Sequence, residues 1–285
     1  MALIASALVD RPDIAVECNE AGRYFNTRLM APNAWEVCVD PSLIDEAAAM
    51  FEAIEGGAGR RAVEIDRHER LVSSDGRAYF ITRPDWNSDI TWVAVDDSPT
   101  FAVYQRLFER LAIPQRFAGV VTGNPRLYGA YFVVRSKCDS TNLHTDFEAE
   151  ALSDCFTVMT PLHEYASKEQ FQLSYVAVEA HAAPGEAMKA EMDAHGHLRR
   201  YEYKRGKAIV FGSHFLHGTE AGRSHEAEER PHVYLSFVFG SDDERRWPDL
   251  RPSLDWSQSR LLMHPNGTLG LSMLGRRLAQ ESREV

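Results

Sequence analysis

The spacing of apolar residues changes along the chain, and the predicted secondary structure changes with it. Between residues 98 and 113, aromatic and leucine side chains recur at intervals of three or four, which predicts an amphipathic helix that ends at Pro114. A second helix is predicted after Asp40, with Pro41 at its first position and Gly56-Gly57 at its end. Runs of β-branched and aromatic residues predict a sheet beside the helix at 98–113, with strands at 62–66, 78–83 and 90–95.

From residue 118 onward, the pattern becomes a series of short apolar runs separated by Asn, Asp, Gly or Pro. A helical pattern interrupts the series at residues 186–194. Because strands that follow one another without helical crossovers pair antiparallel, we expect a sandwich or barrel rather than a doubly wound parallel sheet. The predicted strands are 118–121, 127–135, 155–162, 171–178, 198–203, 207–212 and 232–240.

We expect a single domain spanning residues 1–285, since neither an internal repeat nor a low-complexity linker divides the chain. Residues 1–117 would form a supporting region of helices and strands, residues 118–240 the β core, and residues 241–285 a C-terminal extension. This extension is polar before a final predicted helix. It could cover the barrel or contribute to a homodimer, and the sequence leaves both open.

Composition and charge narrow the classes of function. The 285 residues include 31 Lys and Arg against 42 Asp and Glu, a net charge of −11, and no long basic cluster, so a nucleic-acid partner is not expected. No apolar run approaches the ~18 residues that span a membrane, and the first residues lack the basic start of a secretory signal. The four cysteines form no C-x-x-C pair, which argues against thiolate zinc sites. We expect a cytoplasmic globular protein.

Two side chains of metal-ligand type stand two positions apart at His144 and Asp146. On an extended segment, residues i and i+2 point to the same side, so an imidazole and a carboxylate would face one point. The predicted strand at 207–212 leads towards His217, which would supply a second imidazole. Two imidazoles and one carboxylate on one face of a metal leave the opposite face open, which suits ferrous iron that binds both an oxidant and a cosubstrate.

Arg230 follows His217 by thirteen positions and stands just before the predicted strand at 232–240. Its planar guanidinium is suited to pairing with a carboxylate. Within residues 118–240, the order His-x-Asp, distal His, Arg resembles that of the iron(II)/2-oxoglutarate-dependent dioxygenase superfamily. The sequence FLHGT at residues 215–219 resembles the distal-histidine turn of its phytanoyl-type members. His214 also follows the strand and is the alternative third ligand, but this turn favours His217.

The resemblance implies a double-stranded β-helix core of the jelly-roll, cupin-like type, and hence a mainly β fold with flanking helices. It also implies an oxidoreductase that uses Fe(II), 2-oxoglutarate and O2, with Arg230 holding the far carboxylate of 2-oxoglutarate. The expected reaction is hydroxylation of an unactivated C–H bond of a small molecule, such as an amino acid or a secondary metabolite, as in a biosynthetic enzyme. Desaturation and ring closure use the same ligands and stay open.

Two other classes of function also fit the motif. Two histidines and a carboxylate can hold zinc with a water in the open position, which would give a hydrolase. A cupin-like module without catalytic activity could also retain the three side chains.

Strand parity predicts part of the pocket wall. In the strand at 127–135, Tyr131, Val133 and Arg135 share one face. Tyr131 is expected to hydrogen-bond the cosubstrate, and Arg135 to anchor an acidic group of the substrate. The alternative for Arg135 is a solvent-facing position on an edge strand.

Further pocket residues are predicted because they lie beside the His-x-Asp motif or in a predicted loop. Asn142 is expected to contact the cosubstrate, and Phe147 the substrate, because they flank the motif. Tyr128 is a further candidate for the substrate, as is Trp86, which lies in a loop rich in Asp, Asn and Pro that could form a lid. Thr157, on the following strand, is a weaker candidate.

Overall fold

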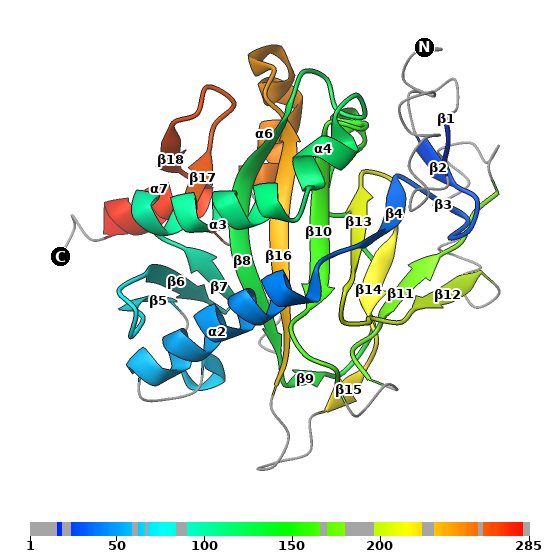
Figure 1. Ribbon diagram of the computed structural model, residues 1–285. Helices are drawn as coiled ribbons and strands as arrows, with labels where there is room; N and C mark the ends of the chain where they lie inside the picture. Colours follow the sequence, from blue (N-terminus) through cyan, green and yellow to red (C-terminus); the bar gives the residue numbers. More distant parts are fainter. Residues whose placement is uncertain are drawn as a thin grey trace.

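The computed structural model describes residues 16–18, 24–58, 62–65, 68–83, 90–165, 170–179, 197–223, 231–255 and 259–281. These residues build an eight-stranded antiparallel sheet with the strand order β4-β13-β10-β16-β8-β7-β6-β5 (Figure 1). Strands from the first third of the chain therefore extend the sheet formed by the later ones. The bounds are β4 (Ala34–Cys38), β5 (His68–Val72), β6 (Ala78–Thr82), β7 (Ile90–Val95), β8 (Pro125–Arg135), β10 (Cys155–Pro161), β13 (Lys207–Gly212) and β16 (His232–Ser241).

A second, smaller sheet has the order β12-β11-β14, formed by Leu198–Tyr201, Leu173–Val176 and His217–Thr219. Along the chain from β8 onward, the large sheet receives β8, β10, β13 and β16, and the small sheet receives the segments between them, with β11 and β12 entering it together as an antiparallel pair. The segment around His144 extends the small sheet, because its backbone pairs with His217 of β14. This alternation is that of a jelly roll, so the predicted fold class, mainly β with flanking helices and a cupin-like core, is confirmed.

Three helices cover one face of the large sheet: α2 (Pro41–Ala58), α3 (Ser98–Arg110) and α4 (Ile113–Phe117). Figure 1 shows α2 and α3 crossing this face side by side. The backbone N–H of Thr100 donates to Asp97 Oδ1 at 2.8 Å, which caps α3 at its N-terminus. Apolar side chains of these helices and of the strands beneath them form one continuous core.

The prediction that α2 ends at Gly56-Gly57 is wrong, since the helix continues to Ala58. A Cβ atom at position 57 would lie 2.5 Å from the backbone nitrogen of Ser74. The glycine therefore permits close packing of the helix against residues 73 and 74.

Side-chain alternation in β8 separates this core from the space between the sheets. Ala130, Phe132 and Val134 belong to the core under the helices. Tyr131 and Arg135 line a cavity on the opposite face. Because both faces of β16 are covered as well, its residues are all buried, as expected for the centre of a two-sided sheet.

Two predicted strands are absent from the structure. Residues 62–64 form a short 3-10 helix, η1 (Ala62–Glu64), and residues 118–121 form a turn with a single bridge between Ala118 and Val121. Ala62 is nevertheless fully buried in the core under the helices. In these two segments the apolar residues indicate that the chain is buried, and they do not indicate a strand. The predicted helix at 186–194 lies outside the described residues.

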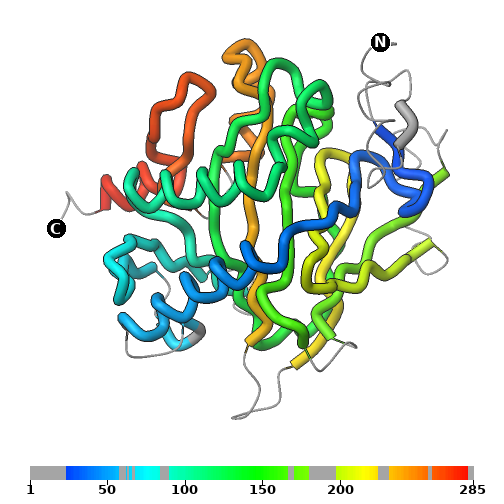
Figure 2. Tube along the Cα trace, in the orientation of Figure 1, coloured from blue at the N-terminus to red at the C-terminus, as the bar shows by residue number. Residues whose placement is uncertain are grey.

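The remaining elements surround the two sheets, and Figure 2 shows the C-terminal hairpin beside α3. Arg260, just before this hairpin, donates to the buried carboxylate of Asp96 at 2.6 and 2.7 Å. Among the described helices, none combines the length and the apolarity needed to cross a membrane. The elements are β1 (Val16–Cys18), β2 (Tyr24–Asn26), β3 (Ala31–Pro32), β9 (Lys137–Cys138), η2 (Ala149–Ala151), β15 (Gly222–Arg223), η4 (Glu244–Arg246), α6 (Trp247–Asp255), β17 (Leu261–Met263), β18 (Leu269–Leu271) and α7 (Met273–Glu281).

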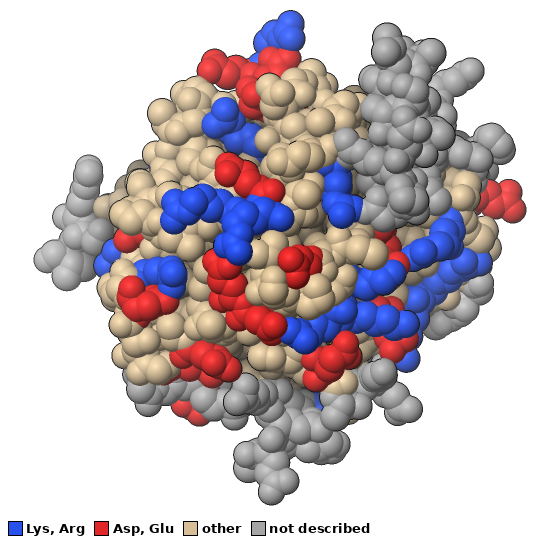
Figure 3. Space-filling model, viewed as in Figure 1, with Lys and Arg blue, Asp and Glu red and all other residues tan. Residues whose placement is uncertain are grey.

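Charged side chains of both signs are interspersed on the face covered by α2 and α3 (Figure 3). One example is Arg110 of α3, which donates to Glu46 of α2 at 2.6 Å. Such exposed ion pairs contribute little to stability.

Candidate active site

Two histidines lie opposite each other between the sheets because their backbones pair. The N–H of His144 donates to the carbonyl oxygen of His217 at 2.8 Å, and the N–H of His217 donates to that of His144 at 2.9 Å. Their ring centroids are 4.7 Å apart. This pairing brings together two residues that are 73 positions apart in the sequence.

The orientation of both imidazole rings is set by backbone carbonyls. His144 Nδ1 lies 2.9 Å from the carbonyl oxygen of Asn142, and His217 Nδ1 lies 3.0 Å from that of Phe215. Since a carbonyl oxygen only accepts, each Nδ1 carries the proton in the neutral ring, and each Nε2 presents a lone pair. This is the arrangement that histidines adopt when Nε2 ligates a metal.

Asp146 completes the group. Its Oδ1 lies 3.5 Å from His144 Nε2 and 3.7 Å from His217 Nε2. One ligand atom from each of the three residues lies within 4.8 Å of the others. The Oγ1 of Thr157 on β10 donates to the other carboxylate oxygen, Oδ2, at 2.7 Å. The three side chains can therefore share a single metal ion.

Burial and mutual charge shift the pKa values of all three groups. Burial raises the pKa of Asp146, but its contacts with His144 and His217 outweigh this effect and hold the pKa at about 2. Burial lowers the pKa of His217 to about 4. Burial also acts to lower the pKa of His144, but the neighbouring Asp146 raises it above its ordinary value. Near neutral pH the site therefore offers an ionised carboxylate and a neutral His217 as ligands.

These donor atoms fit a divalent transition metal. Two imidazole nitrogens and one carboxylate oxygen form the facial set found in non-haem iron(II) oxygenases, and the same set also binds zinc. The hydrogen bonds to Nδ1 of each ring and to Asp146 Oδ2 supply the outer contacts that orient metal ligands.

Asn142 contributes to the site through its backbone. Its side chain is exposed and is not among the residues of the cavity wall, and its contact with the cosubstrate stays a prediction. Its carbonyl oxygen instead accepts from His144 and lies against Gly218, where a Cβ atom would be only 2.6 Å from that oxygen. Gly218 thus allows β14 to approach the segment that orients the first ligand.

His214 is not a member of the ligand group. It occupies a turn with φ of 66°, in the left-handed region. The turn reverses the chain after β13, so that Phe211 and Phe215 pack against the His217 ring at centroid distances of 4.4 and 5.3 Å.

A cavity of about 260 Å³ opens beside the ligand group. The structure places Tyr131, Arg135 and Phe147 on its wall, together with Thr157. Only 8% of the surface of Arg135 is exposed, and β8 lies between β7 and β16, so the alternative of a solvent-facing edge position is wrong. The cavity also has aromatic and sulfur-containing lining that the sequence did not single out: Trp92, Met159, Phe171, Tyr203, Phe211 and Tyr234.

Tyr128 is not among the residues that line this cavity, and its role as a substrate contact stays a prediction. The pairing of β8 with β16 shifts between Val238 and Phe239, where Tyr128 is the extra residue of a β-bulge. Its side chain packs beside Trp247 of α6 at a centroid distance of 5.8 Å, and its hydroxyl donates to the carbonyl oxygen of Ser241. Trp86 and Arg230 lie outside the described residues.

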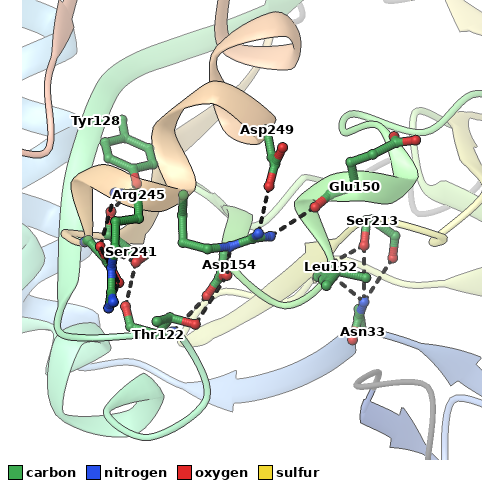
Figure 4. A network of polar contacts seen from close by, with 12 residues as sticks. Asn33, Thr122, Tyr128, Glu150, Leu152, Asp154, Ser213, Ser241, Arg245 and Asp249 are labelled. Atoms are coloured by element: carbon green, nitrogen blue, oxygen red, sulfur yellow. Dashed lines mark hydrogen bonds and ion pairs between the residues drawn. The ribbon is translucent and has the colours of Figure 1, made fainter.

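Arg246 in η4 holds the segment between Asp146 and β10 from one side. It donates to the carboxylate of Asp154 at 2.5 Å, to Asp249 at 2.6 Å, and to the carbonyl oxygen of Glu150 at 2.9 Å. Figure 4 shows these acceptors arranged around one guanidinium. The segment that follows the first two ligands is thereby attached to the start of α6.

Asn33 holds the same segment from the other side (Figure 4). Its Nδ2 donates to the carbonyl oxygens of Leu152 at 3.3 Å and Ser213 at 3.1 Å. Ser213 stands four positions before His217. One fully buried amide therefore connects the segment after Asp146 with the turn that leads to the third ligand.

No protein-family model matches the chain, and no curated protein matches it. Among solved structures, it is similar to AviO1 from Streptomyces viridochromogenes, with 16% identity, 75% of this chain and 92% of that chain covered, and a TM-score of 0.47. It is also similar to HygX from Streptomyces hygroscopicus with nickel, 2-oxoglutarate and hygromycin B bound, with 14% identity, 73% of this chain and 82% of that chain covered, and a TM-score of 0.45. A third similar structure is SnoK, a non-heme alpha ketoglutarate dependent carbocyclase from nogalamycin biosynthesis, with 13% identity, 77% of this chain and 85% of that chain covered, and a TM-score of 0.49.

Proposed function

We propose that this protein is an iron(II)- and 2-oxoglutarate-dependent oxygenase that acts on a small molecule. The observation that carries the proposal is the convergence of His144 Nε2, His217 Nε2 and Asp146 Oδ1 within 4.8 Å beside a cavity. With iron bound, the site would supply the coupled reaction in which a substrate C–H bond, 2-oxoglutarate and O2 give a C–OH group, succinate and CO2.

The protein's own contribution is to bind the metal, the cosubstrate and the substrate, to orient them, and to exclude water. His144, Asp146 and His217 would hold the metal, and Tyr131, whose pKa burial and the nearby Asp146 charge raise, would stay protonated and donate a hydrogen bond to the cosubstrate. The resemblance assigns the far carboxylate of 2-oxoglutarate to Arg230. Phe147 and the other aromatic side chains of the cavity wall would bind the apolar part of the substrate and keep water away.

The outcome at the substrate depends on where its C–H bond lies relative to the metal. Hydroxylation is the proposed outcome. Desaturation and ring closure use the same ligands, and product analysis separates the three.

The decisive experiment measures succinate. The protein is loaded with Fe(II) without oxygen, mixed with 2-oxoglutarate, and exposed to air with and without a panel of amino acids and secondary metabolites. We expect succinate release that depends on both iron and 2-oxoglutarate, that a substrate stimulates, and that Asp146→Ala abolishes. Tightly bound zinc with hydrolytic activity would overturn the proposal, as would a complete absence of succinate across the panel.

A further inference from the structure

The C-terminal extension contributes to the wall of the active-site cavity. Ser253 and Leu254 of α6 line it, together with Ser259. Figure 1 shows α6 near the C-terminal end of β16, which it follows in the chain. The sequence left two roles open for residues 241–285, covering the barrel or contributing to a homodimer. The positions of these three side chains show that part of the extension covers the active-site cavity.

The cavity extends along β16, and the candidate metal ligands lie near the C-terminal end of that strand. Thr157, which holds the Asp146 carboxylate, pairs with Val238. At the other end of the cavity Arg135 is on the wall and pairs with His232, the first residue of β16. His232 stands six positions before Val238, which corresponds to about 20 Å along a strand.

The direction of the cosubstrate leaves the α6 end of the cavity to another molecule. In the proposed function, the keto acid of 2-oxoglutarate binds the metal and Arg230 holds its far carboxylate. Arg230 stands two positions before the start of β16 in the sequence. The cosubstrate would therefore extend from the metal towards the start of this strand. The part of the described cavity that remains for the substrate is the end at α6.

The wall at the α6 end is apolar and adjoins the metal ligands. Phe147 directly follows Asp146 and belongs to one cluster with Val238 and Leu254. All three apolar side chains are buried and line the cavity. A hydrocarbon group gains free energy when it leaves water for such a surface, whereas a charged group loses its hydration there.

Ser253 adds one directed hydrogen-bond donor to this wall. The residue is only 9% exposed, and its Oγ accepts from the backbone N–H of Glu148 at 2.9 Å. A hydroxyl that accepts a hydrogen bond can also donate one. Within the described part of the chain, no residue accepts from Ser253. Because Ser253 lines the cavity, its proton is available to an oxygen atom of a bound molecule.

We propose that the α6 end of the cavity is the substrate subsite, and that it selects a neutral hydrocarbon unit with an oxygen acceptor, such as a ketone, ether or alcohol. The hydrocarbon lies against Phe147, Val238 and Leu254, and its oxygen accepts from Ser253. This inference rests on the proposed function and narrows its substrate class. A free amino acid, which carries two charged groups, fits such a subsite poorly.

The relaxation of probe protons in nuclear magnetic resonance tests the proposal without turnover. Manganese(II) is loaded in place of iron, because its unpaired electrons accelerate the relaxation of protons that bind nearby, and the zinc-loaded protein is the diamagnetic blank. The probes are cyclohexanone, cyclohexanecarboxylate and cyclohexylammonium, which share a ring and differ in charge. 2-Oxoglutarate is present throughout, so that it occupies its own part of the cavity. We expect cyclohexanone to bind at least about tenfold more tightly than either charged probe.

Two leucines of α6 give a matched pair of variants. Leu250 and Leu254 are both buried in the same cluster, but Leu254 lines the cavity and Leu250 does not. Leu254→Ala should admit the larger 4-tert-butylcyclohexanone and raise its affinity relative to cyclohexanone by at least about tenfold. Leu250→Ala should leave this ratio unchanged, although it also removes a buried side chain.

The serine is tested by a second pair. Ser253→Ala should weaken cyclohexanone binding by about 2–10-fold, because it removes the hydrogen-bond donor. Ser253→Thr keeps the hydroxyl and should bind cyclohexanone nearly as tightly as the wild type. Unchanged affinity in Ser253→Ala would overturn the role of the serine.

Manganese and 2-oxoglutarate binding are measured first, because a wild type that fails to bind either one refutes the proposed function itself. A wild type that binds both but does not bind cyclohexanone, or releases it when 2-oxoglutarate is added, overturns the inference alone. An equal change of the size ratio in the Leu254 and Leu250 variants overturns it as well. A preference for cyclohexanecarboxylate would also overturn it and would support Arg135 as the anchor of an acidic substrate.

Discussion

Thr157 Oγ1 donates a 2.7 Å hydrogen bond to Asp146 Oδ2, while the other oxygen of the same carboxylate faces the two histidine Nε2 atoms. The hydroxyl thus holds one oxygen towards β10 and leaves the other for the metal. A carboxylate restrained in this way binds a metal through one oxygen. The remaining coordination positions stay available to a chelating cosubstrate and to O2.

Replacing Thr157 by valine should weaken metal binding, because valine keeps the shape of the side chain and removes the hydroxyl. Loss of an outer-shell hydrogen bond of this kind typically lowers metal affinity about 10–100-fold. A competition titration against a chromophoric chelator measures the effect. Thr157→Ser keeps the hydroxyl and should bind metal nearly as well as the wild type; equal affinities of the Val and Ser variants would show that the hydrogen bond has no such role.

A pair of substitutions distinguishes His217 from His214 as the third metal ligand. His217→Ala removes one of the three ligand atoms and should abolish measurable metal binding. His214→Asn should bind metal like the wild type, since His214 is outside the ligand group and asparagine tolerates the left-handed backbone at this position. Metal content after dialysis, measured by mass spectrometry, checks both variants. Metal loss in the His214 variant alone would reverse the ligand assignment.

Much of the site followed from short-range patterns in the sequence. The i, i+2 spacing of His144 and Asp146 and the parity of Tyr131 and Arg135 depend only on the geometry of extended backbone, so both could be predicted. The fold class also followed, because a series of short strands without helical crossovers has few solutions.

The features that the sequence did not reveal depend on long-range pairing. Trp92 reaches the cavity because β7 pairs with β8, and nothing near position 92 encodes that neighbour. Strict alternation along β8 would place Tyr128 on the helix-covered face with Ala130 and Phe132, but a bulge shifts the register by one residue and puts its side chain in the cluster around Phe147 instead. The role of the Asn142 carbonyl was hidden for another reason, since a backbone group has no sequence signature.

The stability of the protein should depend on pH through His232. Its ring is stacked on Tyr165 at a centroid distance of 3.9 Å and contacts Phe171 and Tyr234. Burial lowers the pKa of His232 from its ordinary value of 6.5 to about 4. Between these values the unfolded chain binds a proton that the folded protein does not. The free energy of unfolding should therefore fall by about 2–3 kcal/mol as the pH decreases from 6.5 to 4.

His232→Phe isolates this contribution, because phenylalanine keeps a flat ring between the same neighbours and cannot be protonated. Urea unfolding of the metal-free protein at pH 7 and at pH 4.5 gives the comparison. The pKa of His217 is also lowered, but it affects the wild type and the variant equally. The variant should lose less stability than the wild type over this interval. An identical loss in both would show that His232 titrates normally in the folded protein.

Asn33 should support both stability and metal binding, since its buried amide joins the two segments that carry the ligands. Asn33→Gly is the appropriate variant, because the residue has φ of 45° and glycine adopts this conformation without strain. The carbonyl oxygens of Leu152 and Ser213 lose a donor, and the buried N–H of Tyr24 loses its acceptor, so the free energy of unfolding should decrease by about 2–4 kcal/mol. Urea unfolding and the chelator competition measure the two effects. Asn124→Gly removes a comparable but exposed contact, the 3.1 Å bond to Asp242, and should change stability by no more than about 0.5 kcal/mol. If Asn33→Gly lowered stability but left metal affinity unchanged, the amide would hold the fold together without positioning the ligands.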